Sequence, residues 1–216
     1  MGAAAGRAPP LGGRRLAHPL RRLSGVTCEP VALPRFAVVD IETSGLSTRR
    51  HRILQIGLVT VVGGRVADQW STLVRLRWPW QRLGPRNVHG LTRRQLRDAP
   101  TLRSALVELA GRLDGAVFTA HNAQFDADFI ERAARREGVA LRLGPRLCTL
   151  RLSRQLDPDR TLSHRLIDIC SRYGIEHGRP HDALYDALAA ASVLPHLLAE
   201  HGVHSGESLA TLYAAR

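Results

Sequence analysis

The sequence lacks lysine altogether and is poor in methionine, cysteine and aromatic side chains, which make up 5% of its 216 residues. The three cysteines, Cys28, Cys148 and Cys170, are odd in number and match no zinc-ligand spacing, so neither a disulfide framework nor a zinc site is expected. Apolar runs are short, as at residues 58–62, and none approaches the roughly 20 residues of a membrane-spanning helix. We therefore expect reduced thiols, a cytoplasmic location and no membrane association.

Every one of the 31 basic residues is consequently an arginine, and against 19 acidic residues they give a formal net charge of +12. A surplus of this size favours a polyanionic partner, because the summed positive potential attracts phosphate. Part of the arginine content reflects a GC-rich genome, since alanine and glycine are abundant too. Charge alone therefore favours nucleic acid as a partner without identifying it.

Composition divides the chain into three regions. Residues 1–34 are rich in Ala, Gly, Pro and Arg and lack a hydrophobic period, so we expect a disordered basic tail. An Arg-rich organelle presequence stays open as the alternative, whereas a secretory signal would need an apolar centre that is missing. Residues 35–203 are expected to form one folded domain, and residues 204–216 a C-terminal tail.

Within the domain, residues 36–41 predict a buried strand, and residues 53–62 and 66–74, separated by Gly63-Gly64, predict a hairpin. Residues 75–90 predict a loop. Further along, the periodicity predicts a short strand at 116–120 and helices near 101–113, 123–137, 147–156, 162–173 and 182–201, the last kinked or shortened by Pro195. Strands that can pair antiparallel, followed by alternating strands and helices, indicate a mixed α/β sheet.

Two carboxylates end the first predicted strand, in the stretch Asp40-Ile41-Glu42. Side chains two apart on a strand project from the same face. Neighbouring carboxylates repel and raise each other's pKa unless a cation lies between them. Asp40 and Glu42 are therefore candidate ligands of a divalent metal ion, although such a pair alone is a weak signal.

A second cluster, residues 121–126 (HNAQFD), directly follows the predicted strand at 116–120. Phe125 and Phe129 stand four apart and predict a packing pair on the core side of a helix. Asp126 then lies in the first turn of that helix, off the core stripe. It is either a further metal ligand or a favourable charge at the helix N-terminus worth under ~1 kcal/mol, and the latter role suits Asp128 better.

The third cluster is residues 181–186 (HDALYD). Positions five apart lie about 140° apart around a helix, so His181 and Asp186 converge only if His181 precedes the helix, as Pro180 favours. Asp182 is then the expected helix N-cap. Surface or packing positions are expected for six further histidines, namely His51, His121, His164, His177, His196 and His201.

In this order and at these separations, the three clusters resemble the motifs of the DEDDh branch of the DEDD 3′→5′ exonuclease family, in particular the proofreading (epsilon) subunit of bacterial DNA polymerase III. Residues 87–92 (NVHGLT) and 148–154 (CTLRLSR) add to the likeness, which runs from about residue 35 to 200. In the sister branch a tyrosine stands four residues before the last aspartate. This sequence has Asp182 there, and His181 one position earlier fits the histidine branch.

The resemblance implies a ribonuclease H-like mixed sheet flanked by helices and two bound ions, Mg²⁺ or Mn²⁺, with His181 as the general base. The ions would be held by Asp40, Glu42, Asp126 and Asp186. It also implies that the terminal nucleotide lies near Thr43, Leu46, His89 and Phe125, with a core position as the alternative for Leu46 and Phe125.

Three functions stay open. Release of nucleoside monophosphates from single-stranded or frayed 3′ ends of DNA is favoured, with a DNA polymerase subunit as a candidate partner. An RNA-directed exonuclease similar to RNase T or oligoribonuclease is the second, because the motifs do not determine discrimination of the 2′-OH. The third is a non-catalytic nucleic-acid-binding or polymerase-tethering module. The sequence argues against it, because all five positions that are catalytic in the family carry the expected residue.

Overall fold

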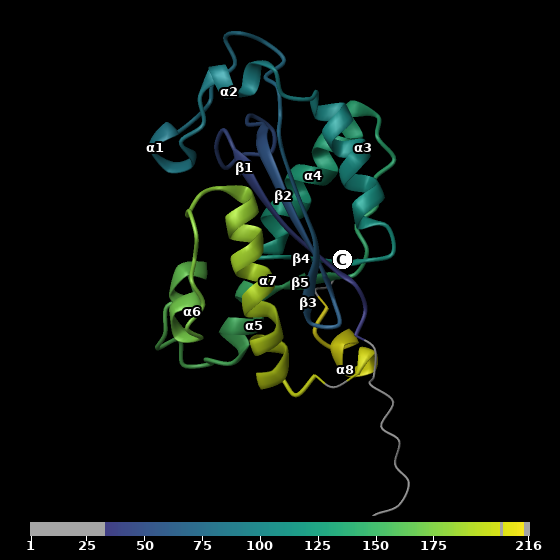
Figure 1. Ribbon diagram of the computed structural model, residues 1–216, viewed down its shortest axis with the longest axis vertical. Helices are drawn as coiled ribbons and strands as arrows, with labels where there is room; N and C mark the ends of the chain where they lie inside the picture. The colour runs from purple at the N-terminus through teal and green to yellow at the C-terminus, as the bar shows by residue number, and fades with distance from the viewer. Residues whose placement is uncertain (1–32, 204, 214–216) are drawn as a thin grey trace, which may run out of the picture. The chain divides into compact units, whose positions relative to one another are not determined.

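The computed structural model describes residues 33–203 and 205–213. Five strands form one mixed sheet in the order β3-β2-β1-β4-β5 (Figure 1). The antiparallel part consists of β1 (Phe36–Thr43), β2 (Ile53–Val62) and β3 (Arg65–Leu73). On the other side of β1, β4 (Val117–Ala120) pairs with it in parallel and β5 (Arg146–Cys148) pairs in parallel with β4. The expected mixed α/β sheet is confirmed.

Helices cover both faces of this sheet (Figure 1). One face carries α3 (Leu102–Leu113) and α4 (Ala123–Glu137). The other carries α7 (Ala183–Glu200), with α5 (Thr149–Gln155) and α6 (Leu166–Arg172) packed against it. Two short helices, α1 (Arg86–His89) and α2 (Arg93–Arg97), lie beyond the end of the sheet at which β1 finishes.

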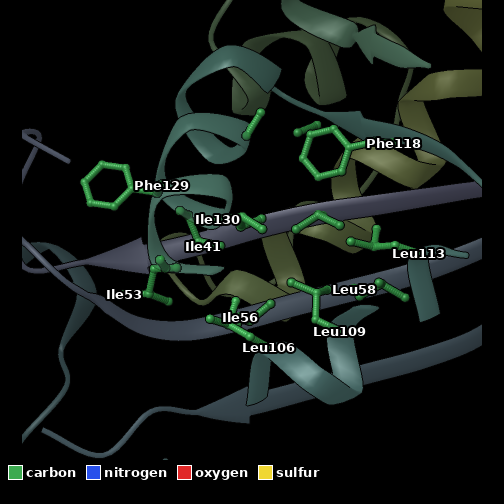
Figure 2. Close-up of a cluster of buried hydrophobic side chains, with 14 of the residues drawn as sticks. Ile41, Ile53, Ile56, Leu58, Leu106, Leu109, Leu113, Phe118, Phe129 and Ile130 are labelled. Atoms are coloured by element: carbon green, nitrogen blue, oxygen red, sulfur yellow. The ribbon is translucent and has the colours of Figure 1, made fainter. Parts of the chain in front are cut away.

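Alternation along β1 determines which core each side chain joins. Ala37, Val39 and Ile41 enter the core beneath α3 and α4, whereas Phe36 and Val38 enter the core beneath α7. Figure 2 shows the first of these cores, where Ile41 and the β2 residues Ile56 and Leu58 face leucines of α3 and Ile130 of α4. Asp40 and Glu42 continue the even-numbered series, so their side chains belong to the α7 face.

Most of the predicted elements are confirmed, including the hairpin with its turn at Gly63-Gly64 and the helix at 123–137. Pro195 does not shorten α7, because the helix continues past it to Glu200. The helix expected at 162–173 begins only at Leu166. The three-residue strand β5 and the helices α1 and α2 were not predicted, since each is too short to show a period.

The expected C-terminal tail is wrong for its described part. Residues 206–210 form α8 (Gly206–Ala210), which starts in a capping box at Ser205. Leu209 is fully buried in the core beneath α7, and Leu212 and Tyr213 pack against the same core. The domain therefore extends beyond residue 203. The predicted basic tail at 1–34 falls almost wholly outside the described residues. Among those described, no helix combines the length and apolar character needed to cross a bilayer.

Candidate active site

The N-terminus of α7 is fixed against β2 directly beside the two carboxylates of β1. Across the β1–β2 pair, Asp40 lies opposite Gly57 and Glu42 lies opposite Gln55. A Cβ on Gly57 would stand 2.2 Å from the carbonyl oxygen of Ala183, so only glycine permits this approach of helix and strand. The side chain of Gln55 donates to Asp182 Oδ1 at 3.1 Å and accepts from the Ala183 amide at 3.4 Å.

Asp182 caps α7 as expected, because its Oδ1 accepts a hydrogen bond from the Leu184 amide at 3.1 Å. With the start of the helix held at this point, Asp186 lies in the first turn and faces the carboxylates of β1. Gln55 and Gly57 are thus positioning residues that our sequence reasoning missed. The signal was present, since a glycine and a glutamine interrupt an otherwise apolar strand.

Burial and mutual repulsion raise the pKa values of the clustered carboxylates. For Asp40 the pKa is raised well above its ordinary value by burial first, and then by the charges of Asp126, Asp186 and Glu42. For Glu42 burial, followed by the charge of Asp186, raises the pKa to about 7. The energy stored in this crowding is released when a cation enters or when protons bind.

Asp126 is 2% exposed and lies in the first turn of α4, as predicted. Burial raises its pKa well above the ordinary value, although backbone amides, including that of Ile41, act in the opposite direction. A helix-terminal charge with no other role would sit in solvent, as Asp128 does, where it accepts a hydrogen bond from Gln124 at 2.7 Å. Asp128 is therefore the residue that acts only as a charge at the start of the helix, and Asp126 points into the cluster.

Two histidines approach Asp186 from the segment before α7. His181 precedes the helix, as expected, in a left-handed conformation with φ 62°, and its backbone N–H donates to Asp186 Oδ2 at 3.1 Å. His177 places Nε2 3.0 Å from Asp186 Oδ1, with a side chain that is only 6% exposed. Burial raises the pKa of Asp186, and the charge of His177 is the first influence that lowers it.

His177 was assigned to a surface or packing position, and its direct contact with Asp186 corrects the assumption that it lies apart from the site. The packing assignment is confirmed for two others. His121 bonds through Nδ1 to Thr149 Oγ1 at 3.0 Å, and burial lowers its pKa to about 4. His164 lies between Ser153 and Asp157, with Nδ1 2.9 Å from Ser153 Oγ and Nε2 3.2 Å from Asp157 Oδ2.

The donor set fits a hard divalent cation. Across the described residues, one group of three or more metal-ligand side chains has its donor atoms within 4.8 Å of one another, and it consists of Glu42, His181 and Asp186. Asp40 and Asp126 lie close enough for the charge of Glu42 to add to burial in raising the pKa of each. Carboxylate oxygens in excess over nitrogen, with no thiolate, favour Mg²⁺ or Mn²⁺ over zinc.

The end of β1 and the loop after it carry Thr43 and Leu46, two of the residues expected to contact a terminal nucleotide. Thr43 Oγ1 donates to the Gly45 carbonyl at 2.8 Å, which closes a tight turn. Gly45 has φ 147°, and the His51 ring stands 2.6 Å from the position of a Cβ, so glycine is required. Leu46, which follows, is 84% exposed, and a core position for it is therefore wrong.

Phe125 and His89 have other surroundings. Phe125 is partly buried and packs on Phe129, with ring centroids 4.9 Å apart, as the four-residue spacing predicted. His89 is buried and both ring nitrogens are engaged, Nε2 with the Leu83 carbonyl and Nδ1 with the Leu91 amide, each at 3.0 Å. The side chain of His89 thus ties together the segment 83–91 and has no free nitrogen for a ligand.

The model of the RNase T exonuclease family matches residues 37–194, a range that contains all three clusters. The chain belongs to this exonuclease family. The resemblance seen in the sequence is thereby confirmed, and the enzyme class is that of a 3′→5′ exonuclease.

Among relatives of this exonuclease, a DNA polymerase III of the PolC type from Staphylococcus saprophyticus subsp. saprophyticus is 30% identical over 181 residues. The match covers 82% of this chain but 12% of that protein. The exonuclease thus spans about an eighth of the length of the curated relatives it matches.

Two solved structures share the fold. Exonuclease X, solved with 5′-overhanging duplex DNA, gives a TM-score of 0.61 at 24% identity and covers 82% of this chain and 98% of its own. The nuclease domain of 3′hExo, a DEDDh family member bound to rAMP, gives 0.66 at 15% identity, covering 77% and 92%. The expected ribonuclease H-like architecture is therefore confirmed.

Proposed function

We propose that this exonuclease uses two divalent ions to release nucleoside monophosphates from 3′ ends, with DNA as the favoured substrate. The observation that carries the proposal is the convergence of four carboxylates from three separate elements on one point beneath the N-terminus of α7. Their raised pKa values have no structural benefit in the absence of a cation.

Each residue has a defined part in this proposal. Asp40, Glu42, Asp126 and Asp186 would hold two Mg²⁺ or Mn²⁺ ions, which supply activation of the attacking water and stabilisation of the leaving 3′ oxygen. His181 accepts the proton of that water. His181 is exposed at the edge of the cluster, and within the described chain no hydrogen bond engages its ring, so the ring nitrogens are open to a water molecule in the site.

His177 has a different part, because it is buried and bonded to Asp186. A histidine that contacts a carboxylate holds that carboxylate in one orientation and lowers its pKa, as His177 does for Asp186. We assign the proton transfer to His181 and the orientation of Asp186 to His177. Thr43 and the exposed Leu46 are proposed to contact the terminal nucleotide, with Phe125 near it. We assign His89 to support of the adjoining segment.

The proposed preference for DNA over RNA rests on the relatives of this exonuclease. The sequence relative is a DNA polymerase, and Exonuclease X was solved with DNA, whereas 3′hExo was solved with rAMP. Matched 3′ ends test the preference: oligo-dT, a dT duplex with a frayed end and oligo-U, each assayed with Mn²⁺ and with EDTA. We expect metal-dependent release from all three and the highest kcat/KM on single-stranded dT. A higher kcat/KM on oligo-U would favour the RNA-directed alternative.

A polymerase partner and a cytoplasmic location are also proposals. Support for the first is the likeness to a segment of a PolC-type polymerase, and support for the second is that Cys148 and Cys170 are free thiols. Co-purification of the tagged chain with a replicative polymerase tests the first. Its absence at cellular concentrations would point to a free-standing exonuclease.

A further inference from the structure

A second feature lies beyond the active site, at the end of the sheet where α2 is found. A hollow of about 1060 Å³ is bounded by the residues just before β2, by the segment that follows β3, by α2, by the start of α3 and by the end of α4. We call it the tryptophan–arginine groove and define it by Trp78, Trp80, Arg50, Arg75 and Arg97. None of these residues has a part in the proposed chemistry.

The groove is strongly positive. Eight arginines line it against a single carboxylate, that of Glu137, which is already paired with Arg136 at 3.3 Å. Within residues 33–203 and 205–213, no hydrogen bond or ion pair engages the side chains of Arg50, Arg75 and Arg97, and all three are exposed. Free guanidinium groups gathered around one hollow favour a ligand with repeated negative charge.

The aromatic side chains of the groove are stacked and open to solvent. The rings of Trp78 and Trp80 lie 5.4 Å apart at an angle of 10°, and the guanidinium of Arg77 stands 5.4 Å from the centre of the Trp78 ring. Trp80 is 74% exposed. A large flat ring exposed to this extent in a chain so poor in aromatics needs an explanation, and stacking of a base on its free face supplies one.

A second hollow lies beside the residues that follow β1 and shares one lining residue with the groove. Ser44 and Gly45, which follow the candidate nucleotide contact Thr43, line a hollow of about 780 Å³ together with Arg82 and Arg86. Arg93 lines both hollows. Its guanidinium donates hydrogen bonds to the carbonyls of Pro79 and Gln81, the two neighbours of Trp80, and so holds this part of the chain in place. A strand that leaves the active site can therefore follow arginines to Trp80.

We propose that the tryptophan–arginine groove binds the single-stranded nucleic acid on the 5′ side of the nucleotide being removed. Its phosphates lie against Arg50, Arg75 and Arg97, and one base stacks on Trp80. Repeated phosphates and bases are the chemistry that matches both halves of this surface. The direction of the strand rests on the proposed function, whereas the binding itself does not.

Binding is measured first without turnover, with the full chain in EDTA and a fluorescent 20-residue oligo-dT. Loss of base stacking by Trp80→Ala should weaken binding at least about 5-fold, and Trp80→Phe, which keeps a flat ring, should weaken it much less. The double variant Arg75→Gln/Arg97→Gln should reduce the salt dependence of binding, by about 0.7 in log–log slope for each lost phosphate contact.

Arg65→Gln is the matched control, because Arg65 is also exposed but begins β3 next to the Gly63-Gly64 turn, at the other end of the hairpin. It should change neither affinity nor slope. A second readout is the Mn²⁺-dependent hydrolysis of the p-nitrophenyl ester of thymidine 5′-monophosphate. This substrate is too short to reach the groove. All four variants should retain this hydrolysis, while the two groove variants Trp80→Ala and Arg75→Gln/Arg97→Gln raise KM for the 20-residue strand.

Wild-type affinity for oligo-dT in both groove variants would overturn the proposal. An equal loss of affinity for polyglutamate in Trp80→Ala would also overturn it, since stacking of bases would then play no part. If the wild type bound oligo-dT through the groove but hydrolysed neither substrate, the proposed function would fail while the groove assignment stood.

Discussion

The Nε2 atom of His177 lies 3.0 Å from Asp186 Oδ1, while the backbone amide of His181 holds the other oxygen of the same carboxylate at 3.1 Å. Both carboxylate oxygens are therefore oriented before any cation binds. One histidine contributes its ring to this arrangement, and the other contributes its main chain and keeps its ring free. Because of this difference, substitution of each histidine should have a different effect on catalysis.

His181→Ala should lower single-turnover cleavage of an oligonucleotide by roughly 10²–10⁴-fold, the usual contribution of a general base, with little change in the metal concentration required. His177→Ala should instead raise the metal concentration required and leave most of the maximal rate, because Asp186 loses an orienting contact. Metal titration of each variant checks both statements. An equal loss of maximal rate at saturating metal would mean that the base has been misassigned.

Gly57→Ala should reduce both stability and activity. Its Cβ would stand 2.2 Å from the Ala183 carbonyl oxygen, so the N-terminus of α7 must move away from β2, carrying Asp186 with it. Overpacking of this kind destabilises by about 1–3 kcal/mol. Gly111→Ala in α3 is the matched control, because no atom lies near its Cβ and alanine favours a helix. Thermal unfolding with an activity assay should show loss only for the first; unchanged activity in Gly57→Ala would exclude the positioning role of Gly57.

Asp126→Asn should abolish nuclease activity and yet stabilise the metal-free protein at about pH 7.5, since it removes a buried charge whose pKa is raised by burial. A difference of one in pKa between folded and unfolded states corresponds to about 1.4 kcal/mol. Asp128→Asn, two residues further along α4 at an exposed position, should change neither property. Denaturant unfolding in EDTA provides the comparison, and destabilisation by Asp126→Asn would mark Asp126 as a structural residue.

Metal-free stability should fall as the pH rises towards neutrality. Burial and the charge of Asp186 raise the pKa of Glu42 from its ordinary 4.5 to about 7 in the folded state. The folded protein therefore binds more protons than the unfolded chain between these values. The contribution of Glu42 to stability is complete below pH 4.5 and is lost as the pH rises through about 7.

The midpoint of thermal unfolding in EDTA should accordingly drop by several degrees between about pH 5.5 and pH 8. Mg²⁺ should restore it at the higher pH, and Glu42→Gln should flatten the profile. A midpoint that rises over this range in wild-type protein, without metal, would show that the carboxylates do not repel one another as described.

The pairing of Asp40 with Glu42 and the position of Asp126 were predictable, because strand alternation and helix periodicity decide where such side chains point. The cap at Asp182 followed from the same rules. His177 was not predictable: it stands nine residues before Asp186, and only the path of an irregular segment, with φ 62° at His181, returns it to the site. No local pattern encodes such a path.

The same limit applies to the segment between β3 and α1. Its tryptophans and prolines predicted a loop, and a loop is what forms, apart from the single turn of α1. Trp78 stacks on Trp80 within this one segment, whereas the arginines of the groove come from five separate parts of the chain. Long-range packing brings those elements together, so the groove becomes visible only in the folded chain.

The central claim is that four carboxylates hold ions that cleave phosphodiesters at a 3′ end. Its most direct test is single-turnover cleavage of one oligo-dT labelled separately at its 3′ and 5′ ends, by wild-type protein and Asp186→Asn, with Mn²⁺ and with EDTA. We predict that the 3′ label appears first as a mononucleotide, only with Mn²⁺, and about 10²-fold or more slowly in a folded Asp186→Asn variant. Release from the 5′ end, cleavage in EDTA, or full activity of Asp186→Asn would contradict the account.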